Sequence, residues 1–262
     1  MAAQAGTRFL VRIEDLDRGR AREEFVKGIF EDLHWLGLTW EEPVLHQSSR
    51  MEAYQSALSR LQKKELLYPC FCSRAHISEE IARAIEAPHF DPLSAPPTGP
   101  DGPHYPGTCR HLDGQERSNR IASGAPYTLR LDVAKTAKQT GPLTLREKNE
   151  TVAVDPFLFG DPVLARKDVP ASYHLAVVVD DAFQNVDLVT RGEDLGPAAH
   201  IQRLLQTLLK LPQPAYAHHR LILDDDGRKF SKRDQAVTLR QMRADGAKAE
   251  DIRARLVVMG LP

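Results

Sequence analysis

The chain has 262 residues, of which 42% are hydrophobic, 27% are charged and 6% are aromatic. This length suits one large domain, or one domain with an insertion, and the composition excludes a fibrous or disordered protein. The formal net charge of −1 argues against a protein that binds a long duplex, because neutralised phosphates drive such binding, but it leaves room for a basic patch that handles one RNA hairpin.

The first part of the chain predicts strands and helices in alternation. Short apolar runs predict strands over residues 8–13 and 66–71, and apolar side chains at helical spacing predict helices over 21–36 and 51–64. A short polar helix is expected over 78–86.

The middle of the chain is rich in loops and leans toward β-structure. Residues 88–106 carry Pro, Gly, His and Asp without periodicity, which predicts a loop. Strands are expected over 127–133, 151–154 and 162–166.

The last part of the chain returns to alternation. Strands are expected over 186–190 and 220–223, an amphipathic helix over 198–209, and two short helices within 236–262. Together with the start of the chain, this order predicts an α/β fold with a Rossmann-like parallel sheet core, interrupted by an insertion. Neither a glycine-rich dinucleotide fingerprint nor a P-loop occurs in the sequence.

Four parts are expected along the chain. Residues 1–66 would form the first part of a nucleotide-binding core, and 67–125 a metal-binding insertion. Residues 126–197 would form a β-leaning middle with the second half of the core, and 198–262 a C-terminal part with a basic loop and helices.

The three cysteines gather in the expected insertion. Cys70 and Cys72 are separated by one residue, and Cys109 ends the segment YPGTC, which begins at Tyr105. Zinc takes four ligands in a tetrahedron, and two close pairs of ligands can close a loop around it. The pattern predicts a structural zinc site that would stabilise a segment with little core of its own. Three unrelated buried cysteines are the alternative.

The fourth ligand has more than one candidate. Coordination chemistry favours His111, two residues after Cys109, over a tyrosine phenolate. His104 is also within reach along the chain.

A basic segment, KFSKR, follows the turn formed by residues 225–227. Lys229, Ser231 and Lys232 supply cations and a hydroxyl on a loop that follows a glycine, which suits a clamp on polyphosphate. Short basic runs are also common on solvated surfaces, so the segment alone decides nothing.

Two further charged segments, RIED at residues 12–15 and TRGED at 190–194, each follow an apolar strand. In open α/β sheets, ligands bind at the carboxyl edge of the strands. An arginine there can fork onto a carboxylate and a glutamate can hold an ammonium group, which together would recognise an amino acid. A surface cluster of ion pairs is the alternative.

Four segments taken together resemble the glutamyl-tRNA synthetase family. They are RIEDLD at 12–17, ASYHLAVVVDD at 171–181, TRGEDL at 190–195 and KFSKR at 229–233, and they occur in the family's order over nearly the whole chain. Within this family the chain is most similar to the short glutamyl-Q-tRNA(Asp) synthetase branch, which lacks an anticodon-binding domain. The chain ends soon after KFSKR, and its C-x-C and Y-x-x-x-C pattern resembles the zinc site of that branch, which favours Tyr105 over His111 as the fourth ligand.

The resemblance implies a role for each matching residue. Glu14 would hold the ammonium group of L-glutamate, and Tyr173 and Arg191 would contact the bound amino acid. The KFSKR residues Lys229, Ser231 and Lys232 would bind ATP, with Lys232 the catalytic residue that stabilises charge on the phosphates.

The resemblance also implies the chemistry and the partners. Glutamate would be activated by ATP with Mg²⁺ and then passed to the queuosine base in the anticodon of tRNA(Asp). A cytoplasmic location is expected, because no apolar run approaches the roughly 20 residues of a membrane-spanning helix and the first ten residues lack a secretion signal. The chain is also expected to be a monomer.

The start of the chain departs from the family pattern. The family's first strand and its H-x-G-H-like motif, which precede the RIED strand, do not occur in this sequence. We therefore expect the natural protein to be longer and the chain as given to activate glutamate poorly, because the phosphate-facing helix terminus is absent. A fragment of an ordinary glutamyl-tRNA synthetase and a non-catalytic relic that binds glutamate or RNA are the alternatives.

Overall fold

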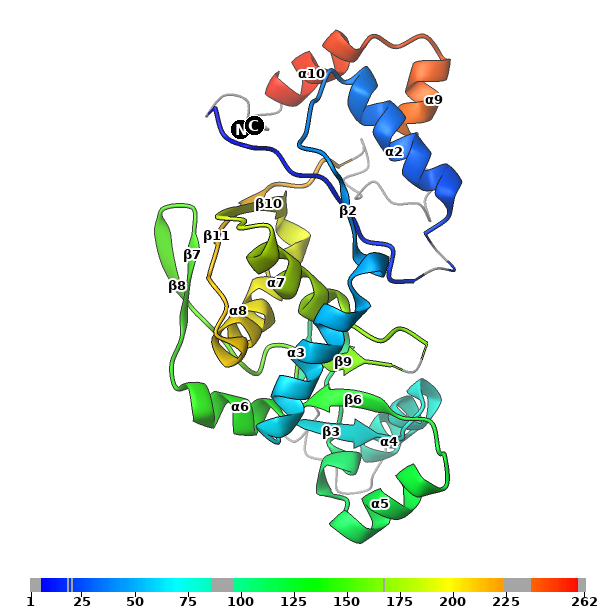
Figure 1. The fold of residues 1–262 in the computed structure, drawn as a ribbon, viewed down its shortest axis with the longest axis vertical. Helices are drawn as coiled ribbons and strands as arrows, with labels where there is room; N and C mark the ends of the chain where they lie inside the picture. The colour runs from blue at the N-terminus through cyan, green and yellow to red at the C-terminus, as the bar shows by residue number, and fades with distance from the viewer. Residues whose placement is uncertain are drawn as a thin grey trace. The chain divides into compact units, whose positions relative to one another are not determined.

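A computed structural model of the chain shows a mixed α/β fold, which confirms the predicted fold class (Figure 1). The structure describes residues 6–17, 19, 21–85, 97–166, 168–223 and 237–258. The chain forms two compact units: a terminal unit of Met1–Arg50 with His219–Pro262, and a central unit of Met51–His218. Each unit is described by itself.

The terminal unit is built on a short parallel strand pair. β1 (Arg12–Ile13) pairs with β2 (Leu45–His46), so that Arg12 lies opposite Leu45. Only two residues of the strand predicted over 8–13 form a ladder. A single 3₁₀ turn, η1 (Gln47–Ser49), follows β2 directly.

Three helices complete the described part of the terminal unit: α2 (Glu23–Trp35), α9 (Leu239–Ala244) and α10 (Ala249–Val258). Arg243 on α9 pairs with α2 through Glu31 at 3.0 Å and Asp32 at 3.2 Å. Arg253 on α10 donates to the carbonyl oxygen of Leu36 at 3.0 Å. Arginine side chains therefore attach α9 and α10 to α2 and to the residue that follows it. The apolar spacing in the sequence predicted α2 itself but not these contacts.

The central unit contains a four-stranded mixed sheet in the order β10-β11-β7-β8. These strands are β7 (Thr144–Glu147), β8 (Glu150–Ala153), β10 (Leu188–Gly192) and β11 (Ala215–His219), the last ending at the boundary of the unit. β11 runs parallel to β7, with Tyr216 opposite Glu147, and β7 forms an antiparallel hairpin with β8. β11 therefore lies between β7 and β10, so residues that are far apart in the sequence lie on neighbouring strands.

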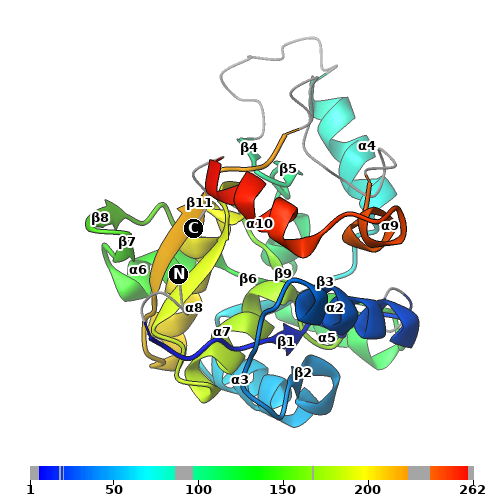
Figure 2. The same cartoon turned by 90° about the horizontal axis from the view of Figure 1, so that it is seen from above.

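A helical layer packs beside this sheet. Its helices are α3 (Met51–Lys63), α6 (Val133–Thr140), α7 (Tyr173–Phe183) and α8 (Ala198–Leu209). Figures 1 and 2 show α8 beside β11, where Ala199 packs with Leu145 and Tyr216. The apolar face of α8 is fully buried, and the helix has the bounds predicted from its periodicity.

A second, antiparallel sheet joins β3 (Leu67–Cys70), β6 (Thr128–Leu131) and β9 (Val163–Ala165) in the order β3-β6-β9. Between β3 and β6 the chain forms smaller elements: α4 (Arg74–Ile85), β4 (Thr98–Gly99), β5 (Gly102–Pro103), η3 (Thr108–His111) and α5 (Gly114–Ala122). The first part of the predicted loop, up to residue 96, lies outside the described residues. The four-part division of the chain remains a prediction.

Some predicted elements were wrong or incomplete. The strand predicted over 220–223 is replaced by β11, which ends at His219. Helix α6 was missed because its eight residues give too few turns for a periodic signal, but Asp132 caps it by accepting from the Lys135 N–H at 2.9 Å. Among the described residues, no helix has the length and apolar character needed to cross a membrane.

Candidate functional site

Arg191 is the centre of a polar cluster in the central unit. It lies on β10, near the end of the strand, and Tyr173 lies at the first residue of α7. Gln202, on the buried face of α8, is 2% exposed, and His218 lies on the neighbouring strand β11. Three elements of the sheet and helix layers therefore converge on the guanidinium of Arg191.

Hydrogen bonds fix most of this guanidinium. Nη1 donates to the hydroxyl of Tyr173 at 3.3 Å and to Oε1 of Gln202 at 3.0 Å, and Nε donates to Nε2 of His218 at 3.0 Å. The guanidinium carbon lies 5.2 Å from the ring centroid of Tyr216, a cation–π contact. Tyr173 and Arg191, the two residues of this unit that the sequence predicted to contact glutamate, therefore lie in direct contact.

Two buried donors of the cluster have no hydrogen-bond partner among the described residues. They are Nη2 of Arg191 and Nε2 of Gln202. Because arginine only donates, the amide oxygen of Gln202 must face it, which leaves the amide nitrogen unpaired. An unpaired buried donor is costly, more so when it is charged. A carboxylate that reached Nη2 of Arg191 would pair with a buried charged donor, so the donor set fits an anion.

His218 is held from the other side by Glu147. The Glu147 carboxylate lies 2.6 Å from Nδ1 of His218 and also accepts from the His218 backbone N–H at 3.0 Å. Burial lowers the pKa of His218, and the positive charges of Arg191 and Lys148 lower it further. The carboxylate of Glu147 raises the pKa, but the net result is a pKa below the ordinary value of histidine. His218 is therefore neutral at neutral pH.

His174, next to Tyr173 on α7, is the most perturbed histidine near the cluster. Burial is the largest cause and lowers its pKa to about 4, with Arg191 adding to the effect and Asp101 opposing it. Its ring lies edge-on to Phe159 and Tyr173, with centroids 5.4 and 5.5 Å away. His174 is therefore an uncharged packing residue at neutral pH.

In the terminal unit, Glu14 and Asp15 follow β1 directly. The Glu14 side chain is 45% exposed, with one carboxylate oxygen 3.9 Å from Nη2 of Arg12. Asp15 accepts from the backbone N–H and the hydroxyl of Ser48 at 2.8 and 2.7 Å. Burial opposes its ionisation, but the bonds from Ser48 and His46 outweigh burial and lower the pKa of Asp15. Asp15 thus anchors the turn, and Glu14 reaches solvent.

The basic loop predicted to bind ATP, with Lys229, Ser231 and Lys232, lies outside the described residues. Its role stays a prediction.

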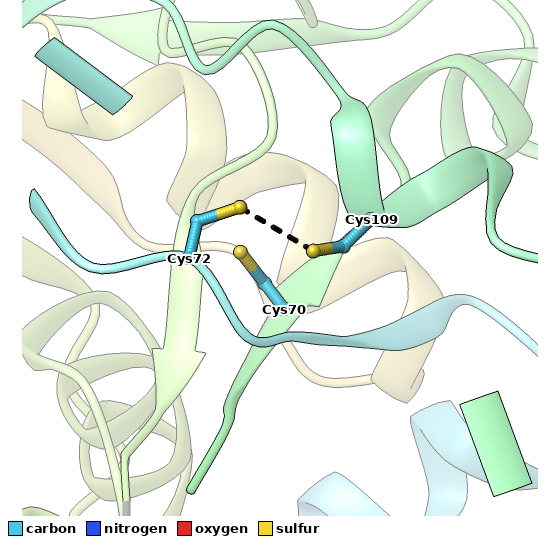
Figure 3. Close-up of side chains that lie close together, drawn as sticks. All are labelled: Cys70, Cys72 and Cys109. Carbon is cyan, nitrogen blue, oxygen red and sulfur yellow. Dashed lines mark hydrogen bonds between the residues drawn. The ribbon is translucent and has the colours of Figure 1, made fainter. Parts of the chain in front are cut away.

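The three cysteines come together at the end of β3 and in η3. Figure 3 shows their side chains pointing toward one another, and the three sulfur atoms lie within 4.8 Å of each other. Sγ of Cys72 is 3.4 Å from Sγ of Cys109. Four ligands about 2.3 Å from a tetrahedral zinc are about 3.8 Å apart. The spacing of Cys70, Cys72 and Cys109 therefore fits a metal site.

Tyr105, the proposed fourth ligand, lies beside this cluster. Its hydroxyl lies 3.6 Å from Sγ of Cys72 and accepts from the Cys109 N–H at 2.7 Å. The ring nitrogen Nε2 of His104 instead lies 3.1 Å from the carbonyl oxygen of Leu158, and His111 is exposed. Among the described residues the grouped metal-ligand atoms are those of the three cysteines, without either histidine.

The surroundings of the cysteines favour a thiolate at one of them. Burial raises the pKa of Cys109, but hydrogen bonds from Tyr105, the Phe71 N–H and the other thiols outweigh it and lower the pKa below its ordinary value. Burial raises the pKa of Cys72 to about 11 and also raises the pKa of Tyr105. A bound cation would favour the ionised form at all of these positions. The donor set thus suits zinc.

Sequence reasoning named Tyr173 but missed the other residues that surround Arg191, namely Gln202, His218 and Glu147. Gln202 offered one signal, a polar residue on the apolar face of a periodic helix, but the contact to Arg191 required the packing of α8 on the sheet. Glu147 and His218 are 71 residues apart in sequence and meet only because β7 and β11 are neighbours.

Comparison with known proteins gives a consistent result. The whole chain, residues 1–262, matches the family described as tRNA synthetases class I (E and Q), catalytic domain. It is 46% identical over 261 residues to the glutamyl-Q tRNA(Asp) synthetase of Rhodobacter capsulatus, covering 97% of this chain and 89% of that protein. It is 41% identical over 271 residues to the same enzyme of Nocardia farcinica, covering 100% of this chain and 77% of that protein.

The fold also matches a solved structure. The chain superposes on the glutamate-tRNA synthetase from Elizabethkingia anophelis with a TM-score of 0.71 and 24% identity, covering 87% of this chain and 46% of that chain. At this identity the likeness supports the fold only.

Proposed function

Because the chain belongs to the class I tRNA synthetase family for glutamate and glutamine, we propose that it activates L-glutamate with ATP and transfers it to the queuosine base of tRNA(Asp). The names of its relatives support the tRNA part of this proposal. The observation that carries the glutamate part is Arg191, a guanidinium fixed by three neighbours, with one buried edge that has no partner in the part of the chain that the structure describes.

Arg191 supplies selectivity for glutamate through its Nη2 edge. A γ-carboxylate accepts a charge-assisted hydrogen bond there and can also accept from Nε2 of Gln202. Glutamine would present its amide to the same donors with no charge to pair, and a shorter or apolar amino acid would leave them unpaired. The site therefore rejects the wrong amino acid by leaving buried donors unsatisfied.

Two other residues complete the proposed amino-acid site. Tyr173 contacts the bound glutamate and steadies Nη1 of Arg191 with its hydroxyl, which lies 3.3 Å away. The family resemblance assigns Glu14, which follows β1 in the terminal unit, to the ammonium group.

The reaction proceeds in two steps. The α-carboxylate of glutamate attacks the α-phosphorus of ATP, the P–O bond to the leaving group breaks, and glutamyl-adenylate and pyrophosphate form. Lys232 stabilises the charge that develops on the phosphates, with Lys229 and Ser231 binding them and Mg²⁺ accompanying the ATP. The queuosine base then takes the glutamyl group and AMP leaves.

The cysteine site serves structure. Zinc held by Cys70, Cys72, Cys109 and Tyr105 would have no open position for a substrate, so it would supply a cross-link rather than chemistry. The link would join the end of β3 to η3 across the loop-rich segment between them.

The test is glutamate-dependent pyrophosphate exchange, followed by glutamylation of tRNA(Asp) with and without queuosine. It uses a version of the chain extended upstream with the family's first strand and H-x-G-H-like motif, because we expect the 262-residue chain to activate glutamate poorly. We expect exchange with glutamate but not glutamine, and transfer only to the queuosine form. Arg191→Ala should raise the glutamate requirement and weaken discrimination against glutamine. The control is Arg203→Ala, since Arg203 donates to the Thr144 carbonyl oxygen and not to the cluster.

Each alternative has its own outcome. Charging of tRNA(Glu) in place of tRNA(Asp) would identify an ordinary glutamyl-tRNA synthetase. Glutamate binding without any exchange would support a non-catalytic relic. An unchanged glutamate requirement in Arg191→Ala would remove Arg191 from the site.

A further inference from the structure

We propose that His218 is a positioning residue for amino-acid recognition: in its neutral form it links Glu147 to Arg191 and holds the guanidinium so that Nη2 faces the substrate carboxylate. This inference rests on the proposed function of Arg191 and adds two residues to it. It also predicts a dependence of glutamate binding on pH.

The direction of the hydrogen bonds assigns the proton on His218. Nε of Arg191 carries a hydrogen and can only donate, so Nε2 of His218, 3.0 Å away, must accept. A neutral histidine that accepts at Nε2 carries its proton on Nδ1, which then donates to the Glu147 carboxylate at 2.6 Å. The chain of contacts therefore runs from carboxylate to imidazole to guanidinium.

The sheet explains why these three residues meet. β11 lies between β7 and β10, so His218 sits between Glu147 on one neighbouring strand and Arg191 on the other. The side chain of His218 is 9% exposed. Its position is thus set by backbone pairing as well as by its own hydrogen bonds.

The contact with His218 decides which edge of Arg191 remains available. Tyr173 and Gln202 occupy Nη1 and His218 occupies Nε, so Nη2 is left for a ligand. Tyr216 supports the face of the guanidinium. Without the acceptor at Nε, the guanidinium could rotate and pair elsewhere, and a carboxylate would then have to bear the free-energy cost of reorienting it.

Protonation of His218 would break this arrangement. It would place an N–H against the Nε–H of Arg191 and a cation beside a cation. The charged groups that face His218 are Glu147 and Lys148 from the β7–β8 hairpin and Arg191 from β10, while Tyr216 stacks on its ring with centroids 5.9 Å apart. The pKa of His218 is lowered, chiefly by burial, so the ring is neutral at neutral pH and a more acidic solution than for an ordinary histidine is needed to charge it.

Two substitutions separate the two ends of the imidazole. The amide of His218→Gln reaches the place of Nε2 and can still accept from Arg191, but it does not titrate. The amide of His218→Asn reaches only the place of Nδ1, so it keeps the contact with Glu147 and loses the one with Arg191. If His218 positions Arg191, only His218→Asn should weaken glutamate binding at neutral pH. If His218 merely supports the fold, the two variants should have similar effects.

The experiment is calorimetric titration of the full chain with L-glutamate, in the absence of ATP and tRNA, at about pH 7 and about pH 5. We expect wild type to lose affinity at the lower pH and His218→Gln to bind similarly at both. His218→Asn should bind about tenfold more weakly at the higher pH. Neither glutamate's own carboxylates nor His174, with its pKa of about 4, titrates in most of this window.

The outcomes separate this inference from the proposed function. If His218→Asn binds glutamate as tightly as wild type at about pH 7, His218 does not position Arg191. Arg191→Ala should weaken glutamate binding by about 100-fold. If Arg191→Ala binds glutamate like wild type, the proposed recognition itself fails, whatever the His218 variants do.

Discussion

Replacement of Asp161, a buried carboxylate beside the second sheet, should destabilise the central unit. The Asp161 side chain is 5% exposed. Its Oδ2 accepts from the hydroxyl of Tyr68 at 2.6 Å and from Nη1 of Arg110 at 3.0 Å, and its Oδ1 accepts from the Val133 N–H at 3.0 Å. One carboxylate thus joins β3, η3 and the start of α6.

The magnitude follows from what Asp161→Ala would leave behind. Tyr68 is 4% exposed and Val133 is 1% exposed, so both donors would be buried without a partner. Each such donor costs about 1–3 kcal/mol, which gives about 2–6 kcal/mol for the pair. Arg110 is 30% exposed, and water would replace most of its ion pair, so it adds at most about 1 kcal/mol.

The assay is urea unfolding at neutral pH. All six tyrosines lie within residues 51–218, whereas both tryptophans lie in the terminal unit, so near-ultraviolet dichroism of tyrosine follows the central unit and tryptophan fluorescence follows the other. Tyr68→Phe is the matched control, since it removes one hydrogen bond but leaves Asp161 two partners, and should cost about 1 kcal/mol.

A double-mutant cycle of Asp161→Ala and Tyr68→Phe measures the coupling free energy between the two side chains. Because Tyr68 has no partner left to lose once Asp161 is gone, the two losses should not add. A loss below about 1 kcal/mol for Asp161→Ala, or full additivity with Tyr68→Phe, would refute the claim that the buried carboxylate anchors these elements.

Two further predictions concern the metal site and the pH dependence of stability. Purified protein should hold about one zinc per chain, and Cys72→Ser should lose it, whereas His104→Ala should keep it; full occupancy by metal analysis in Cys72→Ser would exclude the assignment. Burial lowers the pKa of His174 to about 4 in the folded protein, from an unfolded value near 6.5. Between these two values the unfolded chain binds one more proton than the folded chain. The free energy of unfolding must therefore fall as the pH drops below about 6.5. His174→Phe should reduce that fall in urea unfolding measured at several pH values, and an unchanged slope would show that His174 does not cause it.

The sequence alone determined the elements whose signal is local. Apolar residues recur at helical spacing in α2, α3 and α8, and the observed bounds of these helices agree with prediction to within about two residues, the usual uncertainty at helix ends. The α/β class followed from the order of such elements. The family resemblance rested on four short segments in order, and the comparisons confirmed it.

Elements without a local signal were misplaced or missed. Helix α6 is short and is fixed by its cap at Asp132, and β11 contains two histidines and a tyrosine rather than a purely apolar run. Its identity as a strand comes from pairing with β7 and β10. Pairing is a property of distant segments, so it leaves little trace in a window of neighbouring residues.

The sites divide in the same way. Residue type and spacing named Cys70, Cys72 and Cys109, because metal-ligand pairs are close in sequence. The family resemblance favoured Tyr105 over His111, and the fold shows that the His104 ring contacts the carbonyl oxygen of Leu158. Arg191 was named from its motif, whereas Gln202, Glu147 and His218 were not. Their roles depend on which strands and helices lie side by side, since hydrogen bonds form between atoms a few ångströms apart in space, however far apart the residues lie along the chain.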